Sequence, residues 1–143
     1  MSRLARLIPA VTLLVATAGC GEESCTLIDC ESTLEVSYGD IVVNEAYSLT
    51  INPSGQTLTV TCLSNDPDAE PLPDWLECDA NGFEVTGENA SGTTISVTVV
   101  PLSTQEALIP SALVPLTVDE TLQPNGPDCE PVCYRRVGVV AGA

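Results

Sequence analysis

The sequence predicts an all-β protein, an antiparallel, disulfide-stapled β-sandwich of about seven strands. Apolar and polar residues alternate over several short runs, turn-forming residues separate these runs, and the chain has seven cysteines but few aromatic residues. Val, Ile, Leu and Thr are abundant and long polar tracts are missing, so this acidic chain is expected to fold and not to remain disordered.

The first strands follow from a period of two. Residues 34–38 alternate, and residues 41–43 resume the pattern after a Gly-Asp turn. Residues 47–51 and 58–62 alternate on either side of the turn at 52–55, which predicts a hairpin.

Later runs predict further strands and one helical turn. Residues 83–85 follow a turn at 79–82, and residues 94–99 form the clearest alternation in the chain. Residues 103–106 fit a capping box, which predicts a single helical turn. Because Pro115 cannot donate to a ladder, the strand expected at 113–118 should lie near a sheet edge. The last expected strand covers residues 133–140.

Residues 1–19 have the order of a secretory signal peptide, with basic, then apolar, then small residues. The apolar run at 7–18 would rise about 18 Å as a helix, which is well short of a hydrocarbon core of about 30 Å. This segment is therefore expected to be cleaved off.

The run Thr17-Ala18-Gly19-Cys20 resembles the lipobox of bacterial lipoproteins. The resemblance implies cleavage before Cys20, acylation of Cys20 with chains such as palmitate, and membrane anchoring. Gly21 follows where an Asp often retains such lipoproteins at the inner membrane, which implies the outer membrane or cell surface of a bacterial envelope. Ordinary secretory cleavage that leaves Cys20 as a thiol is the alternative. Assigning Cys20 to lipid leaves an even number of cysteines for crosslinks.

The charge pattern bounds the partners. All 20 acidic residues lie after Cys20, and Arg135 and Arg136 are the only basic residues there. The mature chain of about 124 residues therefore has a formal charge of −18. Such a surface repels phosphate backbones, and no nucleic-acid partner is expected. Residues 20–32 are expected to be a lipidated acidic tether, and residues 33–143 the folded domain.

The six remaining cysteines form three close sequence pairs. In an exported chain disulfides are favoured over a zinc site, because oxidation competes with thiolate ligation and the chain has no His. The spacing of the last pair is not that of a Cys-x-x-Cys redox motif. Fifteen pairings are open, and pairing of neighbours is favoured. The neighbours are Cys25 with Cys30, Cys62 with Cys78, and Cys129 with Cys133.

An acidic loop offers weak calcium candidates. Asp66, Asp68 and Glu70 occupy alternate positions, and Glu77 stands eleven residues after Asp66, which echoes the ligand spacing of a calcium loop. Pro71 stands where such a loop needs Gly, so a solvated acidic loop is the stronger interpretation. No cofactor is expected.

One segment suggests a family. Leu72-Pro73-Asp74-Trp75-Leu76 is followed by Gly82-Phe83-Glu84-Val85-Thr86-Gly87. Together with the strands around it, from Tyr47 through Val99, this segment resembles the immunoglobulin-like and cadherin-like modules of bacterial surface proteins and dystroglycan. The resemblance implies an immunoglobulin-like sandwich in which Trp75 and Leu76 plug one end and Gly87 permits a tight exit. The calcium signatures of cadherins are missing, so the resemblance carries over a fold and not a ligand.

The sequence lacks the residues and motifs of the common catalytic classes, although its many carboxylates would always offer some close pair. There is no His to act as a base, no Gly-x-Ser-x-Gly elbow and no phosphate loop. Arg135 and Arg136 should point to opposite faces of their strand and pair with surface acids. The expected function is that of a non-catalytic, membrane-anchored surface lipoprotein whose sandwich is a structural or interaction module for an envelope protein or a glycan. A calcium-dependent adhesive module and a carboxylate-based hydrolase are the alternatives.

Overall fold

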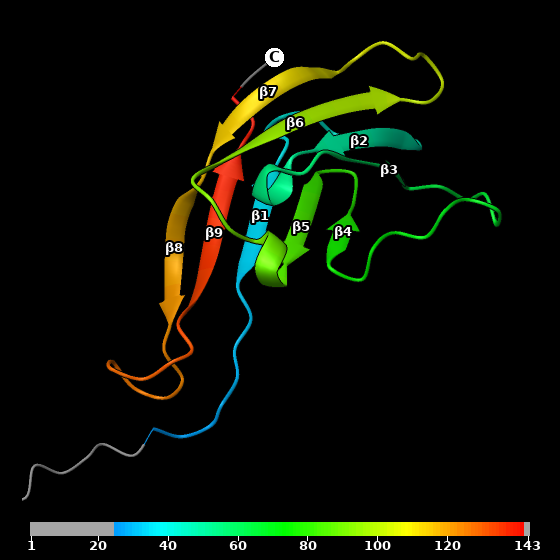
Figure 1. The fold of residues 1–143 in the computed structure, drawn as a ribbon. Coiled ribbons are helices and arrows are strands. Elements are labelled where there is room, and N and C mark those ends of the chain that lie inside the picture. Colours follow the sequence, from blue (N-terminus) through cyan, green and yellow to red (C-terminus); the bar gives the residue numbers. More distant parts are fainter. Residues whose placement is uncertain (1–24, 142–143) are drawn as a thin grey trace, which may run out of the picture.

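The computed structural model describes residues 25–141, which form two packed β-sheets (Figure 1). The expected signal peptide and Cys20 lie outside these residues. The strands of the described part are β1 (Thr33–Ser37), β2 (Tyr47–Ile51), β3 (Leu58–Cys62), β4 (Leu76–Cys78), β5 (Gly82–Thr86), β6 (Thr94–Pro101), β7 (Ile109–Pro115), β8 (Thr117–Leu122) and β9 (Cys133–Val139).

The two sheets confirm the predicted disulfide-stapled β-sandwich. One sheet has the order β4-β5-β1-β9-β8, and the other has the order β3-β2-β6-β7. Neighbouring strands are antiparallel, with the exception of β1 and β9, which run parallel with Thr33 opposite Arg135. Two short helical turns, η1 (Pro53–Gly55) and η2 (Gly87–Asn89), complete the elements. Within residues 25–141, no helix has the length and apolar character needed to cross a membrane.

The core lies between the sheets and is made by every second residue of the strands. In β6, the side chains of Ile95, Val97 and Val99 are buried, and the residues between them are partly exposed. The predicted hairpin of β2 and β3 is confirmed, with Tyr47 opposite Cys62. Gly82 of β5 has no room for a side chain, because a Cβ there would collide with the Val36 carbonyl. The alternation of apolar and polar residues in the sequence therefore predicts most strands of the sandwich correctly.

Three local predictions are wrong. The single strand expected at 113–118 is the end of β7 and the start of β8, because the chain changes sheets at Leu116; the expected edge position is confirmed, since both strands lie at sheet edges. The helical turn expected at 103–106 is displaced: in the loop between β6 and β7, a single turn spans residues 101–105, where the Gln105 N–H donates to the Pro101 carbonyl at 3.0 Å. Residues 41–43 are not a strand, although the Val43 N–H donates to the Ala80 carbonyl at 2.8 Å.

Candidate functional site

The strand register gives the molecule two distinct poles. Tyr47 starts β2 and lies opposite Cys62, which ends β3, and opposite Pro101, which ends β6. We call this end the distal pole. The segment 25–32 precedes β1 and lies at the other end, because Tyr38, which follows β1, reaches Tyr47. Figure 1 shows the blue N-terminal segment and the loop after β3 on opposite sides of the molecule.

Two disulfides tie residues 25–32 to the loop between β8 and β9. They join Cys25 to Cys129 and Cys30 to Cys133. We call this crosslinked region the clamp. Thus the part of the expected tether from Cys25 onwards is covalently attached to the domain, which leaves residues 21–24 between the clamp and Cys20.

Asn125 holds the centre of the clamp with its side-chain amide. Its Oδ1 accepts hydrogen bonds from the Thr26 hydroxyl at 2.7 Å and the Ile28 N–H at 2.9 Å. Its Nδ2 donates to the Ile28 carbonyl at 2.9 Å and the Glu130 carbonyl at 2.8 Å. All four hydrogen-bonding positions of the amide are thereby used, so the two segments are fixed by more than their crosslinks.

The predicted pairing of neighbouring cysteines is confirmed for Cys62 with Cys78 and wrong for the other four. The cause is the parallel pairing of β1 with β9. Parallel neighbours begin at the same end of a sheet, so the segments that enter the two strands lie side by side. Cysteines about one hundred positions apart therefore meet.

The distal pole carries an open hollow of about 640 Å³, which we call the distal pocket. Leu63 and Leu102 contribute its large apolar side chains, 39% and 48% exposed. The volume is within the usual range for small-molecule pockets and exceeds what a single side chain needs. The lining residues come from three loops and are Asn44, Glu45, Ala46, Leu63, Ser64, Asn65, Asp66 and Leu102.

Local backbone geometry positions the two leucines. Leu63 has a φ of 56°, a left-handed conformation that is rare and strained for a leucine. The Leu102 N–H donates to the Ala46 carbonyl at 3.0 Å, which ties two of the loops together. On the third loop, the Ser64 hydroxyl accepts the Asp66 N–H at 3.2 Å. These backbone and side-chain hydrogen bonds therefore hold the rim of the distal pocket.

The charge of the distal pocket is negative. Glu45 and Asp66 line it, and no arginine does. Asp66 Oδ1 accepts the Asp68 N–H at 2.9 Å. A carboxylate can accept at both oxygens, so Asp66 retains capacity for a further donor.

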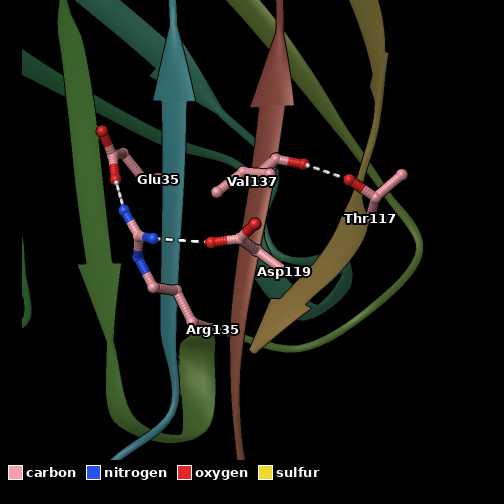
Figure 2. A network of polar contacts seen from close by, with 5 residues as sticks. All are labelled: Glu35, Thr117, Asp119, Arg135 and Val137. Atoms are coloured by element: carbon pink, nitrogen blue, oxygen red, sulfur yellow. Dashed lines mark hydrogen bonds and ion pairs between the residues drawn. The ribbon is translucent and has the colours of Figure 1, made fainter. Parts of the chain in front are cut away.

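Both arginines of the described chain are engaged elsewhere. Arg135 donates to Glu35 at 2.8 Å and to Asp119 at 2.6 Å on the outer face of the five-stranded sheet (Figure 2). The hydrogen bond to Glu35, with attraction to both carboxylates, raises the pKa of the Arg135 guanidinium. Arg136 donates to the Ala90 carbonyl at 2.9 Å and lies 4.9 Å from the centre of the Tyr134 ring. The two side chains point to opposite faces as predicted, but only Arg135 forms an ion pair with an acid.

A row of three glutamates crosses the outer face of the five-stranded sheet. Glu84 lies opposite Glu35 on one side and opposite Glu77 on the other, over a hollow of about 270 Å³. The three side chains lie on one sheet face as cross-strand neighbours, and all three line this hollow. Glu35 is engaged in the ion pair with Arg135.

The four calcium candidates are not brought together. Asp66 lines the distal pocket, Glu70 lies beside β3, and Glu77 belongs to the glutamate row. Within the described residues, no group of three or more acidic, Cys or His side chains is arranged to hold a metal ion. The contact of Asp66 with the Asp68 N–H accounts for the alternate spacing as a local turn.

The four-stranded sheet differs in charge from its partner. None of the residues in β2, β3, β6 and β7 is charged, and the outer positions carry mostly Ser and Thr. Leu113 is the most exposed large apolar side chain on this face, at 69%. This sheet face therefore exposes an apolar side chain without nearby strand charges, whereas the distal pocket combines apolar and acidic side chains.

The sheet edges are all protected against an added strand. β4 has only three residues, and Pro71 and Pro73 lie beside β3. Pro110 and Pro115 interrupt β7, and a bulge at Asp119 interrupts β8. Short strands, prolines, charges and bulges are the usual devices that block edge-to-edge pairing. Binding of a partner by strand addition is therefore not favoured, and the loops are the better candidates for a binding surface.

A scan against protein-family models finds no match, and searches of curated proteins and of solved structures find none either.

The sequence did not point to the distal pocket. Leu63 and Leu102 look like strand-end residues, and their loops are far apart in the chain. Asp66 is the one lining residue that the sequence singles out, and there it is interpreted as a calcium candidate.

Proposed function

We propose that the protein is a non-catalytic lipoprotein of the bacterial envelope, anchored through Cys20, whose sandwich is an interaction module. The separation of the clamp from the distal pocket is the observation that carries this proposal. Cys25, the first residue of the clamp, stands five positions after Cys20 in the sequence, so an anchor at Cys20 would be tethered to one pole while the distal pocket lies at the other. Extended, five residues reach roughly 17 Å, which keeps the clamp close to the membrane.

The anchor is tested by intact-mass analysis of the protein extracted from membranes. The expected mass lacks residues 1–19, includes acyl chains on Cys20, and lacks the hydrogens lost in three disulfides. A Cys20→Ala variant is the control and is expected to lose membrane retention. Unacylated protein recovered from the soluble fraction would contradict the anchor.

The interaction is tested with a photo-crosslinking side chain placed at one position in intact cells. At position 102, on the rim of the distal pocket, it is expected to form adducts of defined mass. At position 113, which is more exposed but lies on the uncharged sheet face, it is expected to form none. Equal adducts at both positions would reject the distal pocket as the interaction site.

A further inference from the structure

We propose that the distal pocket binds one lysine or arginine side chain of a partner protein. The aliphatic stem would lie between Leu63 and Leu102, and the cationic head would meet Glu45 and Asp66. This inference rests on the proposed interaction function and specifies the chemistry of the partner.

Two leucines of the distal pocket are partly exposed to water. Leu63 and Leu102 come from different loops and remain 39% and 48% exposed. A ligand with an apolar segment would remove both from water, which is favourable. The strained φ of Leu63 is consistent with a side chain held in place for contact and not for packing.

The acids of the distal pocket have no cationic partner in the described part of the chain. The distal pocket presents Glu45 and Asp66, and within residues 25–141 both arginines are bonded at other sites. The mature chain offers no lysine or histidine to pair with these acids. An anionic ligand would be repelled by them. A cation from outside would supply the missing opposite charge.

Lysine and arginine combine the two required features. Each has an apolar stem that can lie against leucines and a charged head that prefers carboxylates. A glycan fits less well, because no aromatic side chain lines the distal pocket. The acidic surface of the whole chain would also attract a basic partner over a distance and speed its association at low salt.

The proposal is tested by titrating three small probes into the natively processed, disulfide-bonded protein and following its backbone amide NMR signals. N-acetyl-lysine methylamide has both stem and charge. N-acetyl-norleucine methylamide has the stem alone, and ethylammonium has the charge alone. The lysine probe is expected to shift signals from residues 44–46, 63–66 and 102 saturably. Each of the other probes is expected to bind about fivefold more weakly, as for loss of one partly exposed ion pair or an apolar contact.

Matched variants locate the effect. Glu45→Gln and Leu102→Ser are expected to weaken binding of the lysine probe about fivefold. Glu84→Gln, in the glutamate row, and Leu113→Ser, on the uncharged face, are expected to leave it unchanged. Ethylammonium binding as tightly as the lysine probe, shifts spread over the glutamate row, or no saturation at the distal pocket would each overturn the proposal. Lipid analysis reports separately on the anchor, so failure of the anchor and failure of the distal pocket are distinguishable.

Discussion

The hydroxyl of Tyr38 donates a hydrogen bond to the hydroxyl of Tyr47 at 3.0 Å, joining the two sheets inside the core. The direction follows because the single proton of Tyr47 is donated to the Asp79 carbonyl at 2.7 Å. The two rings meet edge to face, with centres 6.1 Å apart. This chain of donors ends on the turn between β4 and β5 and leaves Tyr47 at the base of the distal pole.

Replacing Tyr47 should cost more stability than replacing Tyr38. Tyr47→Phe leaves both the Tyr38 hydroxyl and the Asp79 carbonyl without a hydrogen-bond partner. Each buried unsatisfied group should lower the free energy of unfolding by about 1–3 kcal/mol. Tyr38→Phe removes one donor and leaves the bond to Asp79 intact, at about 1 kcal/mol. Urea unfolding of both variants measures the difference. Equal losses would contradict the donor order.

The tyrosine pair should make the fold sensitive to alkali. Burial raises the pKa of Tyr38 and of Tyr47 above the ordinary value of 10.0. The folded chain therefore holds protons that the unfolded chain releases, so this stability is present below about pH 10 and is lost as pH rises above it. The free energy of unfolding should fall between about pH 10 and 12, and it should fall less steeply in Tyr38→Phe. Tyr134→Phe, outside the pair, is the control and should keep the full slope.

The clamp disulfides should be coupled in their effect on stability. With one intact, the other closes a loop of only about ten residues and contributes about 3 kcal/mol in the chain-entropy treatment. With both removed, a loop of more than one hundred residues opens as well, for a total near 7 kcal/mol. Denaturant unfolding of Cys25→Ser/Cys129→Ser, Cys30→Ser/Cys133→Ser and the quadruple variant should therefore show a loss beyond the sum of the two. Strict additivity would refute this coupling between the two interleaved disulfides.

Asn125→Asp should loosen the clamp. The amide nitrogen that donates to the Ile28 and Glu130 carbonyls becomes a carboxylate oxygen, which cannot donate. Two hydrogen bonds are therefore replaced by repulsion between oxygens. Hydrogen exchange should show faster exchange for residues 26–32 while the β6 amides stay protected. Asn52→Asp, whose amide makes one contact of 3.4 Å with Thr57, is the control and should leave residues 26–32 protected.

Leu63→Gly should stabilise the fold and weaken the distal pocket together. Glycine adopts a φ near 56° without strain, which should raise the free energy of unfolding by about 1 kcal/mol. It also removes one of the two leucines that line the distal pocket. Thermal unfolding together with titration of the lysine probe reports both effects. A variant that loses stability would show that Leu63 is packed and not strained.

Local alternation was sufficient to predict most strands, because β6 and the hairpin of β2 with β3 each bury every second residue. It was not sufficient where the chain changes sheets: residues 113–118 are a mostly apolar run with no break at Leu116, which belongs to neither strand. The pairing of β1 with β9 joins residues about one hundred positions apart, so no local pattern reports it. The clamp disulfides and the bonds of Asn125 depend on that pairing. The distal pocket depends on three loops meeting and on the backbone of Leu63, neither of which has a residue-type signature.

The parallel arrangement of β1 and β9 has a mechanical consequence. A pulling force that arrives through the residues before Cys25 reaches a covalent bond to Cys129 before it reaches β1, and a second bond, from Cys30 to Cys133, divides it again. Two adjacent strands are then pulled in the same direction, so the load falls on the hydrogen bonds of β1 to β5 and of β9 to β8, which are sheared together and not opened one at a time. Such a domain can carry tension between its two ends without unravelling from the first strand.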